Sequence, residues 1–221
     1  MAANRWASFV GMSRRQRTRR HEGVHPTYDN ILEQATTVLS EDGFDQFNVQ
    51  RVLDGAEVSR ATLYNHFADV DTLIEAALVA TFAQETDLYR SRVARVIDDA
   101  HDDATFREAL RTLINDFSHL PASVRLRRTH TIALGTTRPS LAASIAEIQD
   151  QITETWSTTI REAQTRGFVR DDLDPHAAAV MVLSLTIGRI VNDAAGNQIS
   201  DEQWASAFFD ILDRAMLTPE N

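Results

Sequence analysis

The amino-acid sequence predicts an all-α protein with a small N-terminal domain of three helices and a larger C-terminal helical bundle. Three observations favour this fold class. Apolar residues recur at the three- and four-residue spacing of amphipathic helices. Capping residues precede these periodic segments, and glycine or proline separates several of them. With 221 residues, 43% of them hydrophobic, the chain is also long enough to bury a sizeable core.

Residues 1–25 are predicted to form a flexible arm, because they have no apolar periodicity. Residues 1–20 contain six arginines and no acid, whereas residues 21–75 contain two arginines and eleven acids. The net charge of −10 therefore conceals a basic arm that can approach DNA, since salt screens a distant acidic body beyond about 8 Å. Simple disorder is the alternative. His21 and His25 have a metal-ligand spacing but no cysteine or clustered acid beside them, so we predict neither a metal site nor a cofactor.

Three helices are predicted after the arm. The first is amphipathic from Tyr28 onward and ends at Gly43. Asn48 is the expected N-cap of a second helix of under three turns, and Ser59 is the expected N-cap of a third. Two short helices joined by a tight turn after a longer one are typical of a helix-turn-helix domain, here assigned to residues 26–72.

The third helix has little apolar surface. At about 100° per residue, Leu63 and Phe67 point into the bundle, and Val58 can pack on Leu63 as a hydrophobic staple. Small or polar side chains occupy the remaining sides: Ala61, Thr62, Tyr64, Asn65 and His66. The major groove of DNA admits such a helix, although a packed hairpin with an exposed polar face fits the same pattern.

Residues 48–74, NVQRVLDGAEVSRATLYNHFADVDTLI, resemble the signature of the tetracycline-repressor (TetR) family of bacterial transcription regulators. Residues 167–190 are similar to the family's entry into its last long helices. The resemblance implies a homodimer that binds double-stranded DNA at a palindromic operator. It implies mostly phosphate contacts by Thr62, Tyr64 and His66. The candidates that it implies for contacts with base edges are Gln50, Arg60, Ala61 and Asn65. The absence of cysteine favours a reducing compartment, and we expect the cytoplasm.

Two residues depart from the family pattern. Glu57 stands at the turn position where the family usually has glycine, and a positive φ there costs a residue with a Cβ roughly 1 kcal/mol or more. Val70 replaces the usual lysine at the start of the next helix, which removes an expected phosphate contact. Weakened DNA binding is therefore an alternative, and the arginine arm could compensate for it.

Residues 73–221 are predicted to form the ligand-binding and dimerisation domain. We expect a long helix over residues 69–100, a short helix over 104–117 and a kinked segment over 121–134. A second long helix over 139–166 ends at Gly167, and two apolar helices follow, one from residue 175 and one over 200–217. Asp174-Pro175 opens the fifth. The apolar surface of the last two exceeds what one layer needs, which predicts a dimer interface. The longest apolar run, 177–188, is too short to span a membrane.

An apolar set with a few polar members indicates either a core or a small-molecule pocket: Leu78, Phe82, Phe106, Leu110, Phe117, Leu126, Thr129, His130 and Trp156. Within it, the residues predicted to contact ligand are Phe82, Phe117, Leu126, Thr129, His130 and Trp156, with the polar pair orienting the ligand. The sequence contains no nucleophile elbow, phosphate loop or paired-carboxylate motif, so no enzyme is predicted. We expect a ligand-responsive repressor or, alternatively, a dimeric small-molecule-binding protein with weakened DNA binding.

Overall fold

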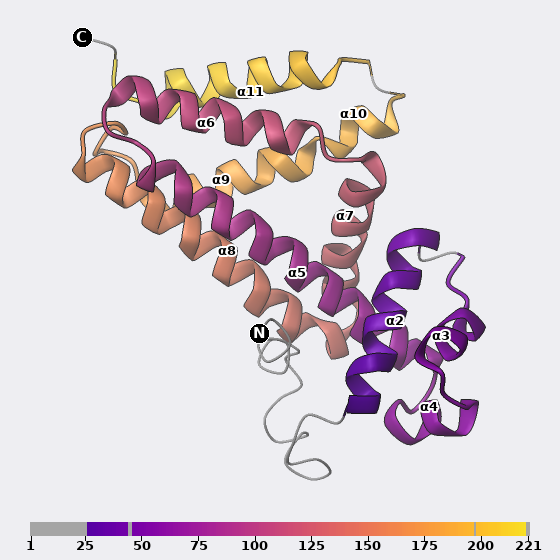
Figure 1. The fold of residues 1–221 in the computed structure, drawn as a ribbon. Coiled ribbons are helices and arrows are strands. Elements are labelled where there is room, and N and C mark those ends of the chain that lie inside the picture. The colour runs from indigo at the N-terminus through magenta and orange to yellow at the C-terminus, as the bar shows by residue number, and fades with distance from the viewer. Residues whose placement is uncertain (1–25, 44–45, 197, 220–221) are drawn as a thin grey trace. The chain divides into compact units, whose positions relative to one another are not determined.

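A computed structural model describes residues 26–43, 46–196 and 198–219. Every regular element in these ranges is an α-helix apart from a single β-bridge between Val169 and Leu217, which confirms the all-α fold class (Figure 1). The predicted arm, with His21 and His25, lies outside the described residues. In chain order the helices are α2 (Pro26–Asp42), α3 (Val49–Ala56), α4 (Arg60–His66), α5 (Val70–Asp98), α6 (Asp103–Ser118), α7 (Ala122–Thr137), α8 (Pro139–Thr165), α9 (Pro175–Gly188), α10 (Ile190–Ala194) and α11 (Asp201–Met216).

The described residues divide into two compact units. The N-terminal unit contains the residues up to Glu85 together with 130–148, and the C-terminal unit contains residues 86–129 and those from 149 onward. Helices α5, α7 and α8 therefore supply residues to both units. The sequence predicts a boundary after residue 72, between the DNA-binding domain and the ligand-binding domain, and this boundary stays a prediction.

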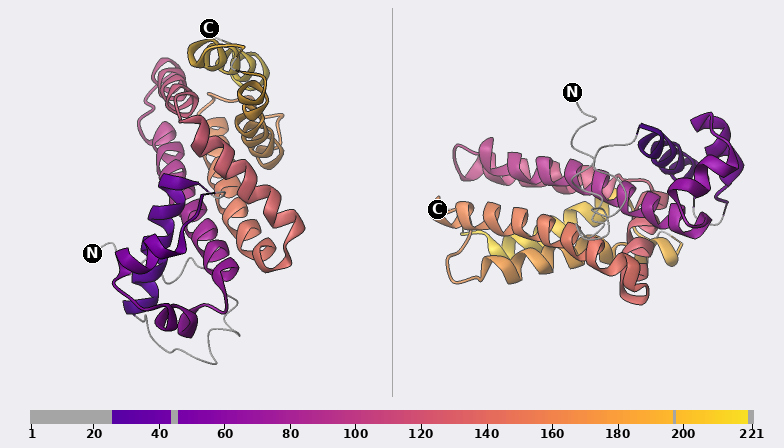
Figure 2. Two further views of the ribbon diagram at one scale, coloured as in Figure 1. Left: turned by 90° about the vertical axis from the view of Figure 1, so that its right-hand side faces the viewer. Right: turned by 90° about the horizontal axis from the view of Figure 1, so that it is seen from below.

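The core of the N-terminal unit joins α2, α3, α4 and the start of α5, and Figures 1 and 2 show α2 to α4 gathered in one small bundle. One residue from each helix illustrates this core, because Ile31, Val52, Leu63 and Leu73 are all 0% exposed. Burying each such side chain contributes roughly 1.5–3 kcal/mol. The short helices α3 and α4 are thus held by tertiary packing rather than by their own length.

The predicted starts and stops of these helices are confirmed. The Asn48 side chain accepts a hydrogen bond from the Gln50 N–H at 2.9 Å, and Ser59 Oγ accepts one from the Thr62 N–H at 3.1 Å. These bonds satisfy N–H groups that have no partner within the first turn of a helix. Gly43, which follows α2, has a φ of +78°.

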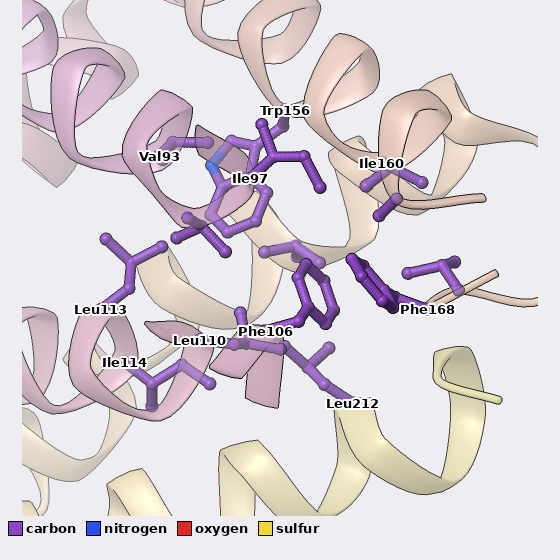
Figure 3. Close-up of a cluster of buried hydrophobic side chains, with 14 of the residues drawn as sticks. Val93, Ile97, Phe106, Leu110, Leu113, Ile114, Trp156, Ile160, Phe168 and Leu212 are labelled. Carbon is purple, nitrogen blue, oxygen red and sulfur yellow. The ribbon is translucent and has the colours of Figure 1, made fainter. Parts of the chain in front are cut away.

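The core of the C-terminal unit is built from α5, α6, α8, α9 and α11. Figure 3 shows Phe106 and Phe168 at its centre, where their rings stack with centroids 5.0 Å apart. Helices α6 and α11 run side by side in Figure 1. Buried Arg107 on α6 joins them, because its guanidinium donates to Asp213 on α11 and to the Thr218 carbonyl oxygen.

Two predicted features differ from the structure. The segment expected to be kinked between residues 121 and 134 is one continuous helix, α7, because Pro121 precedes its first turn rather than interrupting its interior. The short helix α10 was not predicted. Helix α10 follows a turn at Arg189. From the sequence, Arg189 indicated only the end of the apolar run 177–188.

By length and composition alone, one helical stretch of the described residues, Pro175–Ala194, is long and apolar enough to cross a membrane, with a mean hydropathy of 1.4. This stretch is longer than the twelve-residue apolar run expected from the sequence, because the helix continues beyond Arg189. Of its apolar window 17% is buried within the described structure, and the stretch contains a buried arginine that bonds to Asp201. The test is thus weak evidence for a membrane span.

Candidate nucleic-acid interface and effector cavity

Helix α4 presents most of its circumference to solvent. Only Leu63, at 0% exposure, and Phe67 just after the helix, at 2%, are buried. Phe67 stacks on Tyr28 of α2 with ring centroids 4.9 Å apart, which attaches the end of α4 to α2. The expectation that these two residues point inward is confirmed.

The other α4 positions singled out from the sequence form one accessible surface. Arg60, Ala61, Tyr64 and Asn65 are exposed, and Thr62 and His66 are half-buried: Thr62 through its hydroxyl contact with Ser59, and His66 with its ring edge toward Tyr28. We refer to these six residues, 60–62 and 64–66, as the α4 surface. It carries hydroxyl, amide, imidazole and guanidinium groups, which are the groups that bind phosphates and base edges.

Gln50, the seventh position, lies in the first turn of α3. Its side chain is exposed and donates a hydrogen bond to Asp54 Oδ1 at 2.8 Å. A base contact by Gln50 would therefore exchange this bond for one to DNA. Its role as a DNA contact stays a prediction, as do those of the α4 surface.

The turn between α3 and α4 has a left-handed residue at Glu57, whose φ is +55°. The Val58 N–H bonds to the Leu53 carbonyl oxygen, and the Glu57 N–H bonds to that of Asp54, as in a Schellman motif. Glycine is the usual residue at this position because it has no Cβ. The backbone conformation inferred from the family pattern is thus confirmed, and glutamate tolerates it at a cost.

Charged residues on α3, α4 and at the start of α5 differ in their partners. On α3, Arg51 bonds to Glu41 and Asp42. In contrast, Arg60 is exposed and makes no ion pair with any residue in the described part of the chain. Asp69 caps α5, and hydrogen bonds from the Thr72 side chain and N–H hold the pKa of Asp69 below its ordinary value, so this carboxylate stays charged at neutral pH. Arg60 is therefore the one arginine of the α4 surface, and it has no ion-pair partner among the described residues.

The C-terminal unit contains a cavity with a volume of about 70 Å³. Its aromatic wall consists of Tyr89, Phe117, Trp156 and Trp204, and the first two rings meet edge to face with centroids 5.1 Å apart. A bound water needs roughly 10–15 Å³ on the same scale, so the cavity has room for several atoms beyond a single water. Aromatic walls with a few polar groups are typical of small-molecule sites.

Three arginines, Arg125, Arg128 and Arg189, also line the cavity, whereas no aspartate or glutamate is among the described lining residues. Arg125 forms a two-point ion pair with Asp193, with nitrogen–oxygen distances of 2.6 and 2.7 Å. The guanidinium of Arg128 lies over the Tyr89 ring, 4.6 Å from its centroid. The charged residues that line the cavity are therefore all arginines, and Thr129, Gln149 and Thr186 supply its uncharged polar groups.

The cavity includes some of the predicted ligand contacts and not others. Phe117, Thr129 and Trp156 line it. Phe82 packs in a separate cluster of the N-terminal unit, Leu126 is 59% exposed, and His130 belongs to the N-terminal unit, so these three lie outside the cavity wall. Sequence reasoning missed the arginines and Trp204, because helical periodicity carries no signal that a cation is buried.

Comparisons with known proteins agree with this geometry. Residues 31–77 match the family model described as bacterial regulatory proteins, tetR family. The HTH-type transcriptional regulator UidR of Escherichia coli (strain K12) is 25% identical over 182 residues, covering 82% of this chain and 89% of that protein.

Solved structures show the same fold. One is a protein assigned to the TetR-family transcriptional regulators of Mesorhizobium loti MAFF303099, with a TM-score of 0.68, 19% identity, and 87% of this chain and 97% of that chain covered. Another is the transcriptional regulator FadR from Bacillus subtilis in complex with stearoyl-CoA, with a TM-score of 0.61, 19% identity, and 84% and 97% covered. Together with the helix-turn-helix geometry, the match over residues 31–77 and the shared fold support a transcriptional regulator of the TetR type.

Proposed function

We propose that this regulator is a ligand-responsive repressor that binds a palindromic operator and releases it when a small molecule enters the cavity. The observation that carries the DNA-binding part is the α4 surface: a helix with one buried residue and six accessible ones is unfavourable as a packing element but suits a major groove. The related proteins are regulators rather than enzymes, and we propose no catalytic role. The proposed place of action is the cytoplasm.

Dimerisation is the second part of the proposal. Large apolar side chains are exposed on α9, α10 and α11: Val180, Met181, Val191 and Ile211, with exposures of 43, 62, 71 and 51%. Large exposed apolar side chains on three helices favour burial against a second copy. Two-fold symmetry would present two α4 helices to half-sites about one turn of DNA apart or further, which is why we propose a palindromic operator.

Effector control is the third part. Helix α5 carries Leu73, part of the core that supports α4, and sixteen residues later Tyr89, part of the cavity wall. A ligand that favours one position of α5 would alter the presentation of α4. Coupling of this kind requires only that ligand and DNA prefer different conformers, typically by about 1–3 kcal/mol. FadR in complex with stearoyl-CoA supports a small-molecule effector by analogy.

Fluorescence-anisotropy titration tests the DNA-binding part. Labelled DNA from the region flanking the protein's own gene is compared with a scrambled duplex at several salt concentrations. We expect sequence-specific binding that Asn65→Ala weakens by about tenfold, which corresponds to roughly 1.4 kcal/mol. Thr37→Ala is the matched control, since Thr37 is an exposed residue on α2 outside the α4 surface. Equal binding of both duplexes would contradict the proposal.

The second candidate is a dimeric small-molecule-binding protein with weakened DNA binding. Glu57 in its left-handed conformation and Val70 at the start of α5 favour it. The double substitution Glu57→Gly with Val70→Lys separates the two candidates. A large gain in operator affinity would indicate that DNA binding had decayed in the natural sequence, whereas a small change would support the repressor.

A further inference from the structure

Arg189 is the most unusual residue of the cavity wall. Its side chain is 2% exposed. One guanidinium nitrogen, Nη2, donates to Asp201, but Nε and Nη1 are buried and have no hydrogen-bond acceptor among the described residues. Those two nitrogens carry three N–H groups. A buried cation with three unused donors is unfavourable unless an acceptor reaches it.

The surroundings of Arg189 do not supply that acceptor. The guanidinium lies 5.1 Å from the ring centroid of Trp204, which offers a π face but no oxygen. Asp193, the nearest carboxylate along the chain, is already held by Arg125 at 2.6 and 2.7 Å. The described lining of the cavity includes three arginines and no carboxylate, and the aspartates that pair with Arg125 and Arg189 lie outside that lining.

We propose that the cavity binds an organic oxyanion, a carboxylate or phosphate ester on an apolar body, and that Arg189 recognises the anionic group. The aromatic wall of Tyr89, Phe117, Trp156 and Trp204 receives the apolar body. Nε and Nη1 of Arg189 are the unused donors that would bond to the oxygens, because charge-assisted hydrogen bonds are stronger than those between neutral groups. This inference rests on the proposed function only in taking the cavity as the effector site.

Matched ligands test the inference without DNA. Isothermal titration calorimetry on the full chain compares benzoate, 2-naphthoate and octanoate with their primary amides, which have the same bodies and no charge. We expect at least one acid to bind about tenfold or more tightly than its amide, as for a charge-assisted contact. If no acid binds better than its amide, the inference is overturned. Comparison of 2-naphthoate with 2-naphthyl phosphate then tells which oxyanion fits, and a preference for either supports it.

Substitutions assign the preference to Arg189. In Arg189→Gln the acid should bind within about twofold of its amide, and Arg189→Lys, which keeps the charge with fewer donors, should fall between. Arg111→Gln is the matched control, because Arg111 also lies over an aromatic ring, 4.0 Å from the Phe209 centroid, but is exposed and outside the cavity. Circular dichroism checks that each variant is folded. A preference for the acid that survives in folded Arg189→Gln would overturn the assignment.

The outcome can be separated from that of the proposed function. Arg189-dependent binding of an acid that leaves DNA affinity unchanged would support the inference and contradict effector-controlled release. If no acid binds, and an uncharged ligand enters the cavity and releases DNA, the result would support the proposed repressor and overturn the inference that the cavity binds an oxyanion.

Discussion

Removing one partner of the ion pair between Arg125 on α7 and Asp193 on α10 should strongly destabilise the C-terminal unit. Both side chains are nearly buried, with 11% and 9% of their surface exposed, and the pair makes two bonds of 2.7 and 2.6 Å. The substitution Asp193→Asn keeps the shape of the side chain but leaves the Arg125 charge without its partner. Breaking a buried pair from one side costs about 3–5 kcal/mol.

The chain offers an exposed pair with the same geometry as a control. Arg170 and Asp172 also make two bonds, of 2.7 and 2.6 Å, but their side chains are 45% and 61% exposed. Exposed pairs contribute about 0–1 kcal/mol, because water solvates both charges equally well when they separate. Asp172→Asn should therefore change stability little, although its bond distances are the same.

Thermal unfolding followed by circular dichroism at neutral pH measures both variants. At about 2–4 °C per kcal/mol for a chain of this size, Asp193→Asn should lower Tm by roughly 6 °C or more and Asp172→Asn by at most roughly 4 °C. Equal shifts in the two variants would refute the reasoning that burial determines the strength of the pair.

The same pair gives a pH dependence whose sign follows from the structure. The hydrogen bonds and charge of Arg125 hold the pKa of Asp193 below its ordinary value. Its contribution to stability is therefore fully present above the unfolded-state pKa of about 3.9 and is lost as the pH falls through the lower folded-state value. Between pH 7 and pH 5 the Tm difference between wild type and Asp193→Asn should stay constant, and it should shrink below about pH 4.

Three further predictions concern the N-terminal unit. Glu57→Gly should stabilise the protein by up to about 1.5 kcal/mol. Relief of left-handed strain contributes about 1–2 kcal/mol, and the extra unfolded-state entropy of glycine offsets about 0.5–1 kcal/mol of it; a lower Tm would contradict this prediction. Arg60→Ala should weaken operator binding by about 1–3 kcal/mol in anisotropy titrations while binding to scrambled DNA changes less. Leu63→Ala, at a position with 0% exposure, should cost about 2–5 kcal/mol and abolish DNA binding, whereas Asn65→Ala should weaken DNA binding without lowering Tm.

The N-terminal helices were predictable because their signals are local. Asn48, Ser59 and Gly43 act on the neighbouring residues, so capping chemistry read from the sequence placed the helix ends close to their positions in the structure. The inward direction of Leu63 and Phe67 followed from helix geometry alone, and both are buried. The family pattern added the conformation of Glu57, which local propensity would not favour.

The cavity was not predictable in the same way, because its features depend on contacts between distant segments. Arg189 looked like the polar end of an apolar run, yet it is buried beside Asp201 and Trp204, which follow twelve and fifteen residues later. The sequence predicted ligand contacts for both Phe82 and Trp156, because each is an aromatic residue on a helical face. In the structure they pack in clusters of different units. Periodicity indicates which face of a helix is buried and not what covers it.

Footprinting on the DNA flanking the protein's own gene tests the central claim most directly, because it shows where and with what symmetry the α4 surface binds. The account predicts two protected half-sites related by two-fold symmetry and about one helical turn, roughly 10 base pairs, apart or further. Asn65→Ala should lose the protection and Thr37→Ala should keep it. Uniform or absent protection by the folded wild-type protein would contradict the claim that α4 reads DNA sequence.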